Sequence, residues 1–323
     1  MRILFTLFVL TAQLATAQKT TGFHANLDSV QIVISDIDHY LKAYKMAQKQ
    51  LDQRNQIYQR EYIDQASIGL KDYYQRRIQS VEAFVKNQDE KPKFYAAIIP
   101  ALEQVSQQKP AIRKGLQKLK ELYPQAVFPD VYLVVGRWNS GGTVSDNGLL
   151  LSADMLSKSA TVPTDELVDW QRLAYKPASY LPDVVVHELI HTLQARPSGE
   201  RTLLKMAIRE GMADFLTKLA TGKNPSDHIY KWAKPQERVL WQAFKKDMNE
   251  GEPKGWLQEL PKRSDRIADL GYYEGYEIVK AYYEQAADKK QAIGSMLLMT
   301  DYEILFTQSG YEKKMAMAKW SKT

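Results

Sequence analysis

The sequence contains no cysteine among its 323 residues. This absence excludes disulfide bonds, thiolate metal ligands, cysteine nucleophiles and iron–sulfur clusters. Any metal site in this chain must therefore use histidine nitrogen and carboxylate oxygen. The sequence also lacks a long segment with a strong excess of one charge. It contains 44 Lys and Arg and 38 Asp and Glu, and the positive surplus is spread along the chain instead of forming a basic arm. We therefore expect no nucleic-acid partner.

Long hydrophobic runs are absent too, apart from a short one at the start. The first residues, MRILFTLFVLTAQLATAQ, place Arg2 before an apolar run from Ile3 to about Leu14, followed by the small residues Ala15 and Ala17. This is the pattern of a signal peptide cut after Ala17. The run is shorter than the ~20 apolar residues that span a bilayer. We therefore expect an exported chain, periplasmic or secreted, with no stable membrane insertion after cleavage.

The rest of the chain changes character at about residue 129. In residues 18–128 glycine is rare and apolar residues recur at steps of three and four, which predicts a layer of helices to which we assign no chemistry. One such stripe consists of Ile78, Val81, Phe84 and Val85.

Two short apolar runs after Pro129, VYLVVG and LLLS, predict a small antiparallel or mixed sheet. Asn147 and Gly148 precede the second run and favour a tight turn, because both residues tolerate positive φ. Helical patterning resumes at about Asp183. The predicted fold is therefore α+β and predominantly α-helical. It has a signal peptide at residues 1–17, an N-terminal helical region at residues 18–128 and a region with the sheet and further helices at residues 129–323.

The segment VVVHELIHTLQ contains His187, Glu188 and His191. On a helix, residues four apart lie ~6 Å apart along the same face, so both imidazoles can hold one ion. Zinc accepts neutral imidazole nitrogen and keeps an open position in catalytic sites, where Glu188 can reach the bound water. The alternative is a pair of core histidines that are hydrogen-bonded inside a packed interior. It accounts for the histidines but not for the glutamate.

A second helical segment, KMAIREGMADFLTKLATG, places Glu210 19 residues after His191 and Asp214 one turn further on. A carboxylate is a suitable third zinc ligand, and Asp214 on the same face can accept the free N–H of a ligating histidine. Two solvated acids on an exposed face are the alternative. Small and apolar neighbours surround both acids, which favours the ligand interpretation.

Together these residues resemble the gluzincin group of zinc metallopeptidases, whose pattern is HExxH followed about 20 residues later by ExxxD. The resemblance covers residues 187–214. It implies a zincin-like catalytic region with an active-site helix and Zn²⁺ as cofactor. It also implies His187, His191 and Glu210 as zinc ligands, Glu188 as general base and Asp214 as the residue that orients a ligating histidine.

The later segment GYYEGYEIVKAYYE is similar, more weakly, to bacterial families of predicted exported zinc-dependent proteases. In zincins a strand at the edge of the sheet pairs with the extended substrate. By chain order, Leu149 to Asp154 is the candidate for this edge strand, and exposed edges do bind peptides in this way.

The sequence departs from thermolysin-like gluzincins, which use a further histidine to stabilise the oxyanion. The only later histidine, His228, lies in the segment NPSDHIY, which matches no such motif. Tyr272, Tyr273 and Tyr276 cluster at a helix start, and a phenol can donate to a developing oxyanion. We take Tyr273 and Tyr276 as candidate catalytic residues. With 19 tyrosines in the chain, a packing role is the alternative for each.

We therefore predict an enzyme, a zinc-dependent hydrolase acting as a metalloendopeptidase in which zinc-activated water attacks the peptide bond and Glu188 takes its proton. Its partner is a peptide or protein substrate, and the oligomeric state is open. One alternative is an exported, non-catalytic zinc-binding or interaction protein on an inactive zincin scaffold. Another is a zinc hydrolase that acts on a non-peptide amide or ester.

Overall fold

The computed structural model of the chain describes residues 22–253, 255–257 and 267–317. The predicted signal peptide, residues 1–17, lies outside these residues. Helices dominate the described chain and two small sheets accompany them, so the predicted α+β class with predominant helix is confirmed. These elements do not by themselves establish the zincin-like region that the resemblance implied. None of the described helices combines the length and apolarity needed to cross a bilayer.

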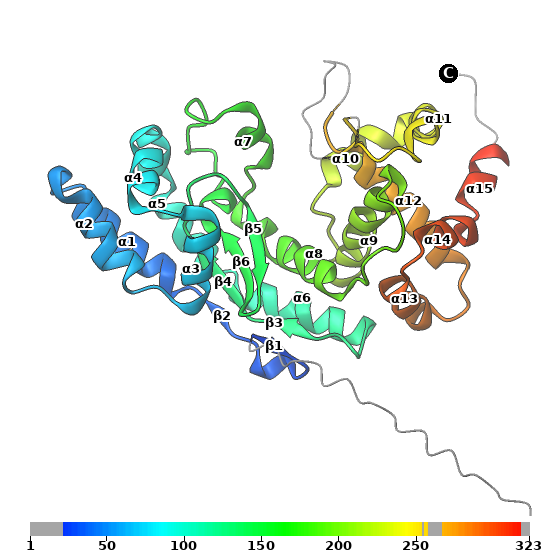
Figure 1. Ribbon diagram of the computed structural model, residues 1–323, viewed down its shortest axis with the longest axis horizontal. Coiled ribbons are helices and arrows are strands. Elements are labelled where there is room, and N and C mark those ends of the chain that lie inside the picture. Colours follow the sequence, from blue (N-terminus) through cyan, green and yellow to red (C-terminus); the bar gives the residue numbers. More distant parts are fainter. Residues whose placement is uncertain (1–21, 254, 258–266, 318–323) are drawn as a thin grey trace, which may run out of the picture.

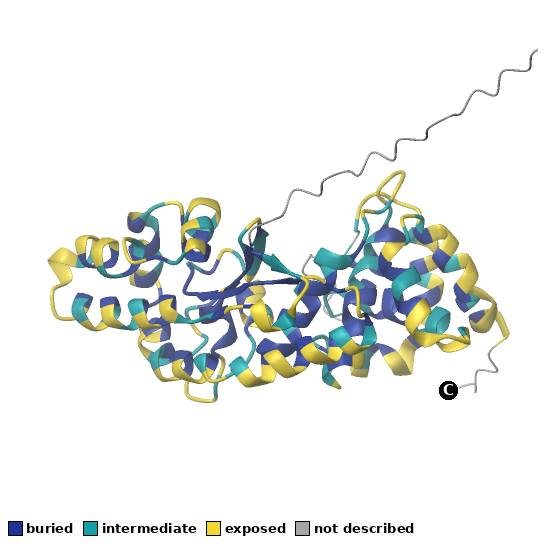
Figure 2. Ribbon diagram, turned by 90° about the horizontal axis from the view of Figure 1, so that it is seen from below, coloured by how far each residue is buried: buried dark blue, intermediate teal, exposed yellow. Residues whose placement is uncertain are grey.

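A four-stranded mixed sheet has the strand order β2-β4-β6-β5 (Figure 1). Its strands are β2 (Ile32–Val33), β4 (Val131–Val134), β5 (Gly142–Ser145) and β6 (Gly148–Ser152). The pairs β2–β4 and β4–β6 are parallel, whereas β5 and β6 form an antiparallel hairpin. Both β4 and β6 are buried along their whole length (Figure 2). Their continuous apolar runs fit this position, because strands covered on both faces need no polar side.

The predicted turn before β6 is confirmed, since Ser145 lies opposite Gly148 in the hairpin. Gly148 has a φ of 139°, and a Cβ there would lie 2.3 Å from the Asp130 carbonyl oxygen, so only glycine fits. The predicted edge strand, Leu149 to Asp154, is wrong. Because β6 pairs with β4 on one side, the hairpin places its first strand, β5, at the free edge.

Helices α1 to α6 lie beside and below the sheet in Figure 1. They are α1 (Ser35–Ala47), α2 (Arg54–Tyr58), α3 (Ile68–Tyr73), α4 (Val81–Asp89), α5 (Pro92–Ser106) and α6 (Lys109–Leu122). The stripe residues Ile78, Val81, Phe84 and Val85 are all buried. A separate two-stranded antiparallel sheet joins β1 (Phe23–His24) to β3 (Phe128–Pro129).

The pairing of β2 with β4 crosses the predicted boundary between residues 128 and 129. The N-terminal helical region and the following region therefore share one sheet. The division into these regions stays a prediction.

Helix α7 (Asp169–Ala174) lies above the sheet, and α8 (Leu181–Leu193) runs from the sheet toward the other half of the molecule (Figure 1). That half consists of α9 (Leu203–Thr221), α10 (Asp227–Ala233), α11 (Glu237–Asp247), α12 (Leu270–Gln285), α13 (Lys289–Leu298), α14 (Tyr302–Ser309) and α15 (Tyr311–Met317). Helix α6 packs against both α8 and α9, which ties the two halves together.

Helices α9 and α12 cross in direct backbone contact. A Cβ on Gly211 would lie 2.0 Å from the backbone nitrogen of Tyr276, and a Cβ on Gly275 would lie 1.7 Å from the carbonyl oxygen of Ala207. Any side chain at either glycine would force the helices apart, because atoms cannot approach so closely. The crossing holds Glu210, the neighbour of Gly211, against the first turns of α12.

Candidate metal centre

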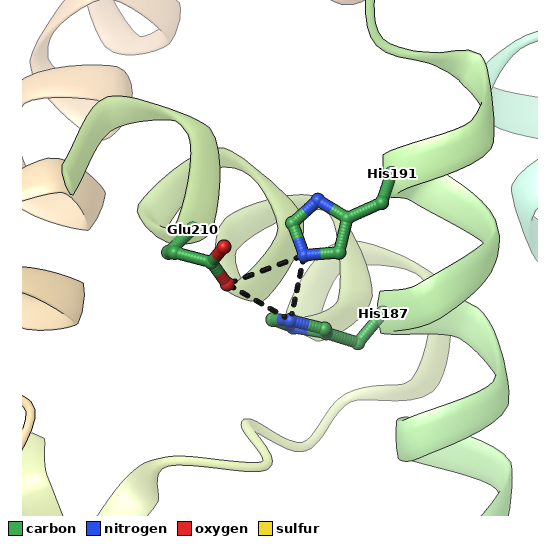
Figure 3. Close-up of side chains that lie close together, drawn as sticks. All are labelled: His187, His191 and Glu210. Atoms are coloured by element: carbon green, nitrogen blue, oxygen red, sulfur yellow. Dashed lines mark hydrogen bonds and ion pairs between the residues drawn. The ribbon is translucent and has the colours of Figure 1, made fainter. Parts of the chain in front are cut away.

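Helix α8 carries the two histidines of the segment HELIH. Pro182 stands in its first turn, where a proline removes no helical hydrogen bond. The following apolar residues are fully buried: Val185, Val186, Leu189 and Ile190. His187 and His191 lie one turn apart on the side of α8 that faces α9, and Glu210 of α9 points toward them (Figure 3).

The three side chains bring one donor atom each to a common place. The Nε2 atoms of His187 and His191 are 3.1 Å apart, and Glu210 Oε2 lies 3.2 Å from the second and 3.5 Å from the first. A tetrahedral zinc ion with ligand distances of about 2.1 Å has donors about 3.4 Å apart. The observed spacings are therefore those of one face of such a tetrahedron. In the described part of the chain, no other group of His, Asp or Glu brings three such atoms within 4.8 Å of one another.

A second layer of contacts fixes both imidazole rings. The Nδ1 atom of His187 lies 2.9 Å from Oδ1 of Asp214, which is fully buried. The Nδ1 atom of His191 lies 2.8 Å from Oε1 of Gln194, whose amide donates to the Arg209 carbonyl at 2.8 Å. These contacts turn both Nε2 atoms toward Glu210. Such partners orient ligating histidines and make them better donors to a metal.

Asp214 therefore lies where the sequence predicted it, next to a ligand candidate. Its other oxygen, Oδ2, is 3.3 Å from the hydroxyl of Tyr230. Gln194 was not predicted. Its position three residues after His191, just beyond the end of α8, was the available sequence signal.

The charges of the cluster stabilise one another. Burial lowers the pKa of His187, but its hydrogen bonds to Asp214 and Glu210 outweigh burial and raise that pKa well above its usual value. Burial raises the pKa of Glu210, but the hydrogen bonds from His187 and His191 hold it well below its usual range. The site thus favours an ionised carboxylate beside positive charge. A divalent cation can supply that charge in place of a histidine proton.

The cluster borders a pocket of about 920 Å³. One wall comes from the sheet, the segment after it and α7, and another comes from α10 and the start of α12, while α8 contributes Val184, His187 and Glu188. The apolar lining residues include Leu151, Met155, Leu156, Trp170, Leu173, Ile229 and Ile267. Glu188 is half-buried and faces this space. The metal-capable residues therefore stand beside a mainly apolar hollow that can accept a ligand.

One of the three clustered tyrosines contacts the candidate metal centre. Tyr272 lines the pocket, and its ring stacks on His187 with centroids 6.2 Å apart. Neither Tyr273 nor Tyr276 lines this pocket. Tyr276 packs with ring centroids 4.6 Å from Tyr230, and Tyr273 is buried near the charges of three glutamates, Glu237, Glu274 and Glu277.

Two basic residues of the pocket were not predicted as site residues. Lys176 follows α7, and His228 belongs to α10. Burial lowers the pKa of His228, and the charge of Lys176 lowers it further, so the two groups face the same space. No sequence signal links them, because they belong to separate segments and only the fold brings them together.

Comparison with known proteins identifies a family other than the gluzincins. The chain matches the family described as gliding motility protein GldB over residues 23–313, nearly all of the described chain. No curated protein matches the chain, and no solved structure does.

This match corrects the functional predictions. The gluzincin assignment is wrong, and so is the prediction of an enzyme that cleaves peptide bonds as a metalloprotease. The family match bears on the reaction and not on single residues, so the roles of Glu188, Tyr273 and Tyr276 stay predictions. The resemblance to gluzincins covered only residues 187–214. The spacing of the histidines and acids in this segment indicates how two helices can hold a metal ion, but it does not specify a reaction. The general prediction that the chain is exported agrees with this match, because the matched family is one of lipoproteins. The chain belongs to the family of gliding motility protein GldB.

Proposed function

We propose that this chain is an exported, non-catalytic zinc-binding protein of the gliding apparatus that holds a segment of a partner protein in the pocket beside the zinc ion. The observation that carries the proposal is the convergence of His187 Nε2, His191 Nε2 and Glu210 Oε2 at separations of 3.1 to 3.5 Å on the border of that pocket. Whether the protein is periplasmic or secreted belongs to this proposal as well.

The donor set supports zinc over the hard cations. Two imidazole nitrogens and one carboxylate oxygen suit zinc, whereas calcium and magnesium prefer oxygen alone. Asp214 and Gln194 hold the outer nitrogens of both rings, as metal-binding histidines require. Three protein ligands leave one position of a tetrahedral ion open to the pocket. A ligand from another molecule can occupy that position.

The walls of the pocket support a binding role. Trp170 is 41% and Leu173 is 54% exposed, so α7 presents large apolar side chains to solvent at the pocket. Gly142 of the free strand β5 lines the same pocket, and a free edge offers unpaired backbone groups to an extended peptide. Such contacts with another protein fit the membership of this chain in a gliding motility family.

The first test is metal content. We expect one zinc ion per purified chain by mass spectrometry, and we expect His191→Ala and Glu210→Ala to lose it. His39→Ala, on α1, is the matched control and should keep it. At a free zinc concentration about 1,000 times the dissociation constant, bound zinc contributes about 4 kcal/mol to stability. A chelator should therefore lower the melting temperature by roughly 8 °C, and only in variants that hold zinc.

The second test asks what happens to a bound peptide. A peptide library is incubated with the zinc-loaded and the chelated chain, and the retained peptides are identified by mass spectrometry. We expect zinc-dependent retention of intact peptides. The proposal would be overturned if the purified chain contained no metal and did not bind added zinc. It would also be overturned if the chain cleaved peptides in a zinc-dependent way and Glu188→Gln abolished that cleavage.

A further inference from the structure

Positive charges gather along α6, on the lower side of the molecule (Figure 1). The apolar residues Leu116 and Leu119 are buried where α6 packs on α8 and α9. On the other side of the helix, Lys114 and Lys118 are exposed and lie one turn apart. Within the described residues Lys114 forms no ion pair, and Lys118 pairs with Glu121 of the same helix at 2.7 Å. The outer face of α6 therefore presents positive charge to solvent.

Two further cations of α6 hold the first segment of the described chain. Arg113 donates to the Val30 carbonyl at 2.8 Å, and Lys120 Nζ donates to the carbonyls of Ala25 and Ala126 at 3.1 Å. Carbonyl groups orient these cations but do not cancel their charge. Neither cation forms an ion pair within the described residues. The segment after β1 is therefore fixed beside the basic face.

The same segment lies close to the predicted end of the signal peptide. Cleavage is predicted after Ala17, and β1 begins six residues later, at Phe23. Even a fully extended stretch of this length spans only about 20 Å. A signal peptide holds the exported chain at the membrane until it is cut. The chain therefore enters its fold close to a membrane and next to α6.

The neighbouring charges do not cancel the charge of α6. The helix itself carries five cations and one acid, and the segment that it holds adds one acid, Asp28. Behind α6, Asp183 of α8 and Lys223 at the end of α9 offset each other. On α13, Lys290 lies near Glu121, and Asp288 caps that helix and offsets its charge. The face keeps an excess of three positive charges.

Exposed apolar groups lie at the end of the basic helix. Val127, which is 39% exposed, directly follows the carbonyl of Ala126 that binds Lys120. A hollow of about 760 Å³ between the end of α6 and α13 is lined by Tyr123 and by Leu298, which is 65% exposed. A free anion would match the charges but leave these groups in water. An anionic bilayer matches both, because its phosphates attract lysines and its interface accepts apolar side chains.

We infer that the face formed by α6 and the end of α13 lies on an anionic phospholipid bilayer, with Lys114 and Lys118 toward the lipid phosphates and Leu298 at the interface. The contact is peripheral and reversible, because it rests mainly on charge. It uses no residue of the candidate metal centre. The inference therefore stands or fails independently of the proposed function.

Co-sedimentation with vesicles measures this contact. The full chain is mixed with vesicles of phosphatidylcholine alone or with vesicles in which one third of the lipid is phosphatidylglycerol. We expect binding that requires the anionic lipid and that is lost in 1 M salt, where the screening length is about 3 Å. Equal binding to both kinds of vesicle, or to neither, would overturn the inference. Displacement by millimolar inorganic phosphate at constant ionic strength would also overturn it, because it would indicate a discrete anion site.

Variants test the face itself. One lysine near an anionic bilayer favours binding about fivefold, so Lys114→Gln combined with Lys118→Gln should weaken binding about 25-fold. Glu121→Gln removes an acid from the same face and should strengthen binding about fivefold. The matched control is Lys45→Gln combined with Lys49→Gln, an exposed pair with the same spacing at the end of α1, which should bind like the parent. If both double variants weaken binding equally, net charge and not this face is responsible, and the inference fails.

The absence of cysteine allows the contact to be located directly. Gln117→Cys introduces a single thiol on the exposed side of α6, and Gln50→Cys introduces one in the helical region after α1. A polarity-sensitive fluorophore attached in Gln117→Cys should brighten on anionic vesicles, whereas the same fluorophore in Gln50→Cys should not. An equal response in both variants would overturn the assignment of this face.

Discussion

Two groups of buried carboxylates pack around α12, and their ionisation is shifted in opposite directions. At the candidate metal centre, the neighbouring histidines hold the pKa of Glu210 well below its usual range. At the second group, burial and the charges of Glu237 and Glu277 raise the pKa of Glu274 well above its usual value. The side chains of both glutamates are largely buried. The partners that surround a buried acid, and not burial alone, therefore set the direction of its shift.

The second group lies between α11, α12 and α15. Glu274 is fully buried, and neither of its carboxylate oxygens has a hydrogen-bond partner. The hydroxyls of Tyr273 and Tyr311 are buried there without partners as well. Within the described residues the nearby cation is Lys234, whose Nζ is 2.8 Å from Glu237 Oε2 and 3.9 Å from Glu277 Oε2.

The comparison shows that the spacing of the donor atoms decides whether a group of buried acids suits a metal ion. At the candidate metal centre, two helices bring three donor atoms to within 3.5 Å of one another. In the described chain, the three glutamates of the second group do not bring one oxygen each within 4.8 Å of the others. One group is preorganised for a cation. The other relieves its charge by keeping a proton on Glu274.

The largest expected effect comes from the helix crossing that positions Glu210. In Gly275→Ala the new Cβ meets the Ala207 carbonyl at 1.7 Å, so α9 and α12 must separate. We expect a loss of about 3 kcal/mol or more in unfolding free energy, measured by urea denaturation, together with weaker zinc binding. Gly294→Ala is the control, because its Cβ would meet only Tyr123 at 3.6 Å. Equal stability of both variants would show that the crossing is not needed.

The next effect concerns the contact that orients His187. Asp214→Asn keeps the shape of the side chain but removes the charge 2.9 Å from His187 Nδ1. Loss of such a partner weakens metal binding by about 10- to 100-fold. Competition with a zinc indicator measures the change. Tyr230→Phe removes only the hydroxyl 3.3 Å from Asp214 and should lower zinc affinity by less. Unchanged affinity in Asp214→Asn would remove this residue from the site.

Much of the candidate metal centre could be predicted from the sequence, because helix spacing is a local property. His187 and His191 lie one turn apart on any helix, and the acids at Glu210 and Asp214 needed only a second helix. Helix spacing alone could not predict that Tyr272 is the tyrosine that stacks on His187. Which of Tyr272, Tyr273 and Tyr276 faces His187 depends on how α12 is rotated at the glycine crossing, and that is a tertiary property.

Two further failures have the same origin. The order of β5 and β6 depends on the pairing of β6 with β4, which is distant in sequence, so chain order named the wrong edge. The pair Lys176 and His228 comes from two segments that carry no shared pattern. The reaction was mispredicted for a different reason. The spacing of the histidines and Glu210 describes the coordination of a metal, and several functions use the same coordination.

The smallest expected effect tests the second group through its pH dependence. A carboxyl whose pKa is raised by folding stabilises the native state fully below the usual glutamate pKa of 4.5. That contribution is lost as the pH rises from there toward the raised pKa, because the native state holds a proton that the unfolded chain releases. Glu274→Gln imitates the protonated form with little change in shape. We expect it to raise the unfolding free energy by about 1–2 kcal/mol at pH 8 and to have no stabilising effect at pH 4.5. Glu303→Gln, on the exposed face of α14, provides the control. A gain that is the same at both pH values would mean that Glu274 does not hold a proton, and the contrast with Glu210 would then rest on geometry alone.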